Sequence, residues 1–127
     1  MIPGSFTSSE LPVSATAFIT AQSASVELVA IMSIASGILN LAQTGLLHQK
    51  RATGPASLLS MLRTRFPETF WQDMPWARQD KIWSSTSAIS ALDMVAAWMR
   101  EYFWDRRDAV EFALMAAGVA PLEEYEE

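Results

Sequence analysis

The sequence predicts an α/β protein with a mostly parallel sheet. The prediction rests on an unbroken apolar run at residues 28–32, a short stretch of small residues directly after it, and helical spacing of apolar residues from position 37 onward. A continuous apolar run suits a parallel strand that is buried on both faces, and apolar residues three or four positions apart indicate a helix. A strand that leads directly into a helix is half of a β-α-β unit, from which parallel sheets are built.

Local composition also predicts the elements in the first part of the chain, residues 1–47. Residues 1–14 are rich in Ser, Thr and Pro and predict a loop, and residues 15–23 predict a short helix with Ser14 as its N-cap. After the strand at 28–32, the small residues predict a tight turn, and the helix that follows is expected to extend from Gly37 to Leu47.

The remaining elements are shorter or more mixed. A helix is expected to start over 58–62, after Pro55, and to end just before Pro67. Residues 71–83 hold two short aromatic-rich stretches that predict short strands or a hairpin, although the turn lacks an Asn-Gly or Asp-Gly pair. Residues 88–103 have helical spacing, and a last helix is predicted with Asp105 as its cap and Gly118 as its end. Residues 122–127 are expected to form an acidic, solvated tail.

The composition excludes several classes of function. With 127 residues, half of them hydrophobic, the chain is expected to form one domain over residues 1–127. A net charge of −5 leaves no basic field for nucleic acid, and the absence of cysteine removes disulfides and thiolate chemistry. The longest apolar run, 28–39, is broken by Ser33, Ser36 and Gly37. We therefore expect a cytoplasmic protein that does not insert into membranes.

Three stretches in the same order resemble the DJ-1/PfpI superfamily, in particular its isocyanide hydratase-like branch, also described as class I glutamine amidotransferase-like. The first comprises Ser33-Ile34-Ala35-Ser36-Gly37, then Gly45-Leu46-Leu47 and Lys50-Arg51-Ala52-Thr53. It is similar to the family's strand, its nucleophile elbow Ser-Val-Cys-Thr-Gly, and the phrase Gly-Leu-Leu-x-Gly-Arg-Arg-Ala-Thr. The others are Trp76-Ala77-Arg78 with Ile82-Trp83-Ser84-Ser85, and Leu92-Asp93-Met94.

The resemblance implies a flavodoxin-like three-layer sandwich, but only part of one. It covers residues 2–103, and Ile2-Pro3-Gly4-Ser5 resembles the Pro-Gly-Gly turn that precedes the elbow in the family. The strands that normally come before that turn have no counterpart here. The resemblance therefore implies a single truncated DJ-1/PfpI-like domain that lacks the family's N-terminal strands.

The resemblance places Ala35 at the position of the family's cysteine nucleophile. A methyl group neither attacks a substrate nor accepts a proton, so the covalent route of the family is closed. Ser36 matches the hydroxyl residue after the nucleophile, and the one histidine, His48, lies beyond the predicted helix and is expected in a solvent-exposed turn. The degenerate elbow Ala35, Ser36 and Gly37 therefore carries no catalytic residue of the family mechanism.

A small set of residues remains as a possible ligand pocket: Ser36, Trp76, Trp83, Ser85 and Asp93. Each also has a structural interpretation, because aromatic residues at strand spacing commonly belong to a core, and an acid inside an apolar helix is commonly a buried hydrogen-bonding group. The run 84–87 lacks the glycine and lysine of a phosphate-binding loop. With one histidine and no cysteine, we expect neither a metal nor a cofactor.

Three functions remain open. The first is a non-catalytic DJ-1-like binding or assembly module, that is, a pseudoenzyme. The second is a lyase, isomerase or cyclase that works without a nucleophile on an apolar small molecule in the old pocket. The third is a truncated gene product. For partners we expect a homodimer or another protein, contacting the helices over 37–47 and 88–103 together with Trp98 and Trp104.

Overall fold

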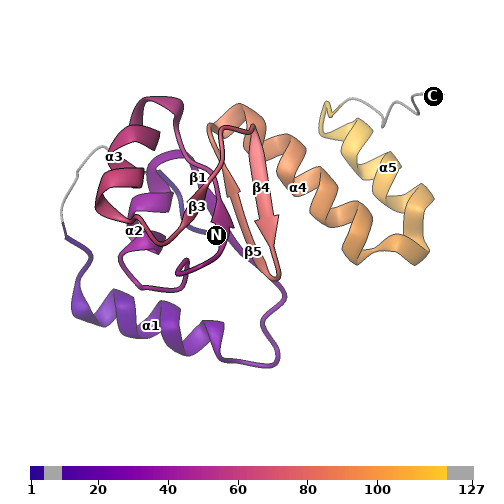
Figure 1. Ribbon diagram of the computed structural model, residues 1–127. Coiled ribbons are helices and arrows are strands. Elements are labelled where there is room, and N and C mark those ends of the chain that lie inside the picture. The colour runs from indigo at the N-terminus through magenta and orange to yellow at the C-terminus, as the bar shows by residue number, and fades with distance from the viewer. Residues whose placement is uncertain (5–9, 120–127) are drawn as a thin grey trace. The chain divides into compact units, whose positions relative to one another are not determined.

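The computed structural model describes residues 1–4 and 10–119, and Figure 1 shows its elements. The chain divides into two compact units, residues 1–91 and residues 92–127. Compactness alone does not decide whether the two units fold independently, so the single domain stays a prediction. The expected acidic tail at 122–127 lies outside the described residues.

The first unit alternates short helices and strands. It contains α1 (Val13–Ser23), β1 (Ile31–Ile34), the 3₁₀ turn η1 (Ala35–Gly37), α2 (Ile38–Ala42), β2 (Arg51–Ala52), η2 (Ala56–Leu58), α3 (Leu59–Arg65), β3 (Phe70–Trp71), β4 (Trp76–Gln79) and β5 (Ile82–Ser85). Helix α4 (Ala88–Tyr102) leads into the second unit, which continues with η3 (Trp104–Arg106) and α5 (Arg107–Ala116). The predicted α/β class is confirmed. In the described part of the chain, no helix has both the length and the apolar character needed to cross a membrane.

The main sheet has three strands in the order β1-β5-β4. Strand β1 pairs with β5 in parallel, from Ile31 opposite Ile82 to Ile34 opposite Ser85, and β4 pairs with β5 antiparallel. A second, two-stranded sheet pairs β2 with β3 in parallel. On the outer edge of β1, the Ile2 amide donates to the Met32 carbonyl at 2.6 Å, and Ile2 accepts from the Ile34 amide at 2.9 Å. The N-terminal segment thus pairs with part of the edge of β1, which is expected from the sequence to be unpaired.

Two predicted elements are placed differently by the structure. The strand expected over 28–32 lies at Ile31–Ile34, because its start is set by the pairing with β5, where the Ile31 amide donates to the Lys81 carbonyl at 2.8 Å. The helix expected to reach Leu47 ends at Ala42. It stops because the Thr44 hydroxyl donates to the Leu41 carbonyl at 2.6 Å and Gly45 takes a left-handed conformation with φ 81°.

The first helix and the hairpin follow the prediction more closely. Helix α1 begins at Val13, two residues before the expected start. Ser14 therefore lies inside the helix and is not its N-cap. The N-cap residue is Pro12, which makes no side-chain hydrogen bond to the helix. Strands β4 and β5 form the predicted hairpin. Its loop uses Asp80 at φ 56° in the position where glycine is usual, a conformation that Asp tolerates better than most residues.

Helices α2 and α3 cover one face of the sheet and close the core of the first unit. Ile31 and Ile82 from the sheet pack in one cluster with Ile38 and Leu41 from α2 and Leu62 from α3. The last three are completely buried. Leu47 is buried in this core as well, whereas Leu39 and Leu46 are half-buried, so the contact of the segment 37–47 with a partner stays a prediction.

Among the described residues of the second unit, an apolar cluster and an ion pair join α4 to α5. Ala96 of α4 packs with Val110 and Leu114 of α5, and the Arg100 guanidinium binds the Glu111 carboxylate through two nitrogens, at 2.6 and 3.2 Å. Helix α5 ends as predicted near Gly118 (φ 83°): the amides after its last turn donate back to the carbonyls of residues 114 and 115, a Schellman motif. Asp105 lies inside η3 and caps nothing, since the cap position of α5 is Arg106.

The ion pair predicts a pH dependence of stability. The hydrogen bond from Arg100 holds the pKa of Glu111 below its ordinary value of 4.5. Folding therefore gains stability from Glu111 above pH 4.5, and loses it as the pH falls through the lowered pKa. Glu111→Gln should lower the free energy of unfolding at pH 7, and this difference from the unmodified protein should shrink below pH 4.5 in urea titrations. The exposed Glu27→Gln serves as control, and an equal effect of both substitutions would contradict the assignment.

Candidate functional site

The chain turns from strand to helix at a single residue, Ala35. Ile34 is still extended, with φ −114° and ψ 122°, whereas Ala35 has φ 52° and Gly37 already has helical angles of −57° and −20°. A left-handed conformation costs a non-glycine residue about 1 kcal/mol. The predicted elbow is therefore confirmed, together with the strained backbone that such elbows use to present one side chain at the end of a strand.

The N-terminal segment passes directly over this elbow. A Cβ atom added to Gly37 would lie 2.3 Å from the Ile2 carbonyl oxygen and 2.8 Å from that of Pro3, so only glycine fits there. A Cβ added to Gly4 would lie 3.0 Å from the Ser36 hydroxyl oxygen. Residues 2–4 and the elbow are thus in contact.

The chemistry of the elbow is limited by Ala35, which is half-buried and carries a methyl group where a nucleophile would stand. His48 lies in the exposed turn after α2, as expected. Its Nε2 atom lies 2.7 Å from a Glu68 carboxylate oxygen, and both side chains are more than half exposed. His48 therefore contacts Glu68 at the surface. Across the described residues, no three His, Asp or Glu side chains gather in a way that could hold a metal.

Three of the predicted pocket residues lie close together on the hairpin. Trp76 is opposite Ser85 in the register, and its ring stacks on that of Trp83 with the centroids 5.6 Å apart. The Arg78 guanidinium lies over the Trp83 ring at 5.0 Å, and Trp83 is 3% exposed. Ser85 is in register with Ile34, the residue before the elbow. The structure therefore brings these residues beside the elbow, with both Trp rings already engaged in packing.

The hydroxyl groups of residues 84–87 have structural partners. The Ser84 hydroxyl accepts the Thr53 amide at 2.9 Å, and the Ser85 hydroxyl lies within reach of two backbone carbonyls, those of Ser33 and Ser87. Ser87 caps α4: its hydroxyl accepts the Ser90 amide at 3.1 Å, while the Ser90 hydroxyl accepts the Ser87 amide at 3.0 Å. This reciprocal capping box explains the serine run without a phosphate.

Sequence reasoning missed Ser33, which it assigned to the turn. Ser33 is completely buried within β1, and among the described residues its hydroxyl has no hydrogen-bond partner. An unsatisfied buried hydroxyl costs about 1–3 kcal/mol. Its register partner on β5 is Ser84, whose hydroxyl accepts the Thr53 amide. A polar residue between the apolar residues of a strand was the signal available in the sequence.

Asp93 does not fit the interpretation of a buried acid, because it is exposed. The reason is its position on α4: residues 89 and 92, on the same side of the helix, are 81% and 60% exposed, whereas Met94 is buried. Asp93 belongs to the second unit. Its part in a ligand pocket stays a prediction, as does that of Ser36.

No protein-family model matches this chain, and no curated protein matches it in sequence. Solved structures do. A ThiJ/PfpI family protein from Pseudomonas syringae aligns with a TM-score of 0.70 at 21% identity, covering 90% of this chain and 45% of its own. A cysteine-to-alanine mutant of a DJ-1 superfamily protein from Salmonella typhimurium aligns with a TM-score of 0.66 at 18% identity, covering 84% and 55%. Schizosaccharomyces pombe DJ-1 aligns at 0.58 and 21%, covering 69% and 45%.

These likenesses confirm the resemblance at the level of the fold. The chain has part of the DJ-1/PfpI fold, and it spans about half the length of the solved structures that it matches. With the elbow at Ala35 and no cysteine in the sequence, this copy of the fold carries no cysteine nucleophile.

The strain at the elbow can be measured by replacing Ala35. Ala35→Gly should raise the free energy of unfolding by about 1 kcal/mol, because glycine adopts a positive φ without steric cost. Ala42→Gly, in the regular helix α2, should lower it by about 1 kcal/mol. Denaturant titration measures the free energy of unfolding of both variants. A loss of stability in Ala35→Gly would mean that the left-handed conformation of Ala35 carries no strain.

Proposed function

We propose that this protein is a non-catalytic DJ-1-like module that works by associating with a second copy of itself. The observation that carries the proposal is Ala35: the elbow keeps its strained φ of 52° but presents a methyl group. The groups around it support the same conclusion. The Trp76 and Trp83 rings stack on each other, and the Ser85 hydroxyl is taken up by backbone carbonyls. These side chains are therefore already used for packing and hydrogen bonding, and not for binding and orienting a substrate.

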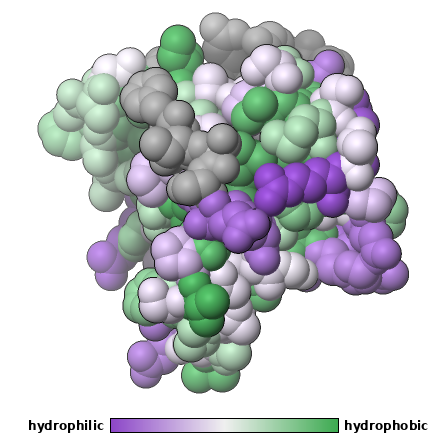
Figure 2. Space-filling view, turned by 90° about the vertical axis from the view of Figure 1, so that its left-hand side faces the viewer, coloured by the Kyte–Doolittle hydropathy of each residue, from purple (hydrophilic) through white to green (hydrophobic). Residues whose placement is uncertain are grey.

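Helix α1 supports association. It buries none of its residues, and Val13 and Phe18 are 87% and 64% exposed. Hydrophobic side chains also reach the surface elsewhere, as Figure 2 shows for one face. Residues 11–26 contain no charged side chain at all. Because each copy carries a net charge of −5, two copies repel each other least across an uncharged surface, and α1 provides one.

The test of association is the mass in solution. At micromolar concentration, light scattering should give twice the 14.0 kDa of one chain. Phe18→Ser should weaken the dimer about tenfold or more, since exposed aromatic residues commonly dominate such contacts. Phe70→Ser is the matched control, because Phe70 is 58% exposed on β3, away from α1, and should leave the dimer unchanged. A cooperatively folding monomer, or equal effects of the two variants, would overturn the proposal.

The elbow itself is tested by restoring a thiol. Ala35→Cys should have a thiol pKa below its ordinary value of about 8.5, because the backbone turns there into the start of a helix, which favours a thiolate. The control is Ala17→Cys, exposed in the middle of α1. Alkylation rates measured across pH give both pKa values. If the two are equal, the elbow no longer supports the chemistry that the missing cysteine requires.

A further inference from the structure

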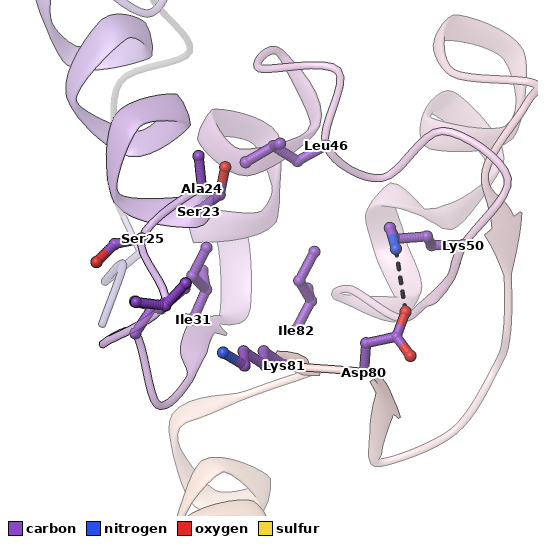
Figure 3. Close-up of a pocket in the computed structure, with 11 residues that line it drawn as sticks. Ser23, Ala24, Ser25, Ile31, Leu46, Lys50, Asp80, Lys81 and Ile82 are labelled. Atoms are coloured by element: carbon purple, nitrogen blue, oxygen red, sulfur yellow. Dashed lines mark hydrogen bonds and ion pairs between the residues drawn. The ribbon is translucent and has the colours of Figure 1, made fainter.

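A cavity lies in the first unit, at the opposite end of strand β1 from the elbow (Figure 3). Its volume is about 460 Å³, within the range of small-molecule sites. Ile31 and Ile82, the first residues of β1 and β5 and register partners, line it, whereas Ala35 follows the last residue of β1. Three residues of β1, 32–34, therefore separate the cavity lining from the elbow, and the two are distinct sites.

The cavity has an apolar body. Ile31, Ile82 and Leu46 point toward its centre, and Leu28 also lines it (Figure 3). At the end of α1, the Ser23 hydroxyl donates to the Thr20 carbonyl, and the Ser25 hydroxyl accepts the Glu27 amide. A ligand would thus gain most of its affinity from apolar contact.

The charged side chains at the cavity leave a positive excess. Lys50, Asp80 and Lys81 are the charged residues that line it, and the Lys50 ammonium lies 3.1 Å from an Asp80 carboxylate oxygen. This pair is neutral as a whole. Lys81 extends from the hairpin turn along the cavity, and its charge is the one left without an opposite charge in the lining (Figure 3).

We propose that this cavity binds a small amphipathic carboxylate, with its hydrocarbon part against Ile31, Leu46 and Ile82 and its carboxylate on the Lys81 ammonium. One compact ammonium matches one negative charge, whereas phosphate groups are usually held by several donors. Binding here requires no nucleophile, and the lining residues all come from one chain.

Isothermal titration calorimetry with octanoate tests the proposal, with octanol and octyltrimethylammonium as probes of equal length. Octanoate should bind saturably, one molecule per chain, and about tenfold or more tighter than either of the other probes. Lys81→Gln should weaken octanoate about tenfold and leave octanol unchanged. The matched control is Arg63→Gln, an exposed cation on α3 outside the cavity.

A second variant tests the location. Leu46→Trp fills the cavity from a half-buried position and should abolish binding of octanoate and octanol alike, while thermal unfolding checks that the variant is folded. Equal affinity for octanoate and octanol, an unchanged octanoate affinity in Lys81→Gln, or no saturable binding would each overturn the proposal. Light scattering on the same samples measures the mass in solution, so that a change in octanoate binding can be distinguished from a change in dimer formation.

Discussion

The parallel pairing of β1 with β5 is the interaction on which the rest of the structure depends. It joins Ile31–Ile34 to Ile82–Ser85, segments about fifty residues apart in sequence. The pairing places Ser85 next to the residue before the elbow and Ser33 next to Ser84. At its other end it brings Ile31 and Ile82 together as the floor of a cavity. A one-residue slip would reverse the side of every side chain along the strand and remove both sites.

The elbow combines a strained backbone with a side chain that has no reactive group. A residue at φ 52° with a methyl side chain carries strain without chemistry, unless the geometry serves packing. The contacts of the N-terminal segment supply such a reason: the carbonyls of Ile2 and Pro3 lie against Gly37, and Ile2 continues the sheet on the edge of β1. The backbone of Ala35 is thus held between two constraints: β1, which is paired with β5 up to Ile34, and the contact of the N-terminal segment with Gly37.

The hydroxyl groups of the chain illustrate how polar residues can be structural in a protein that lacks cysteine chemistry. Ser84, Ser85 and Ser87 satisfy backbone amides and carbonyls at the junction of β5 and α4, where strand and helix leave orphan groups. In sequence alone the same run has the hydroxyl groups of a phosphate-binding loop but not its glycine and lysine. Ser84 pairs with Thr53, which lies in a different segment, and Ser87 pairs with Ser90, one helical turn further along. No local sequence pattern therefore identifies the structural role of this run.

The sequence by itself determined the α/β class, the hairpin and the glycine-ended last helix, because apolar periodicity and glycine conformation are local properties. With the family resemblance it also located the elbow at Ala35. Only the tertiary structure decided where β1 begins, since parallel pairing with a distant strand sets its register. It likewise decided that α2 faces inward, that Asp93 is exposed and that Ser33 is buried. Burial depends on which elements meet, and that information is spread over the whole chain.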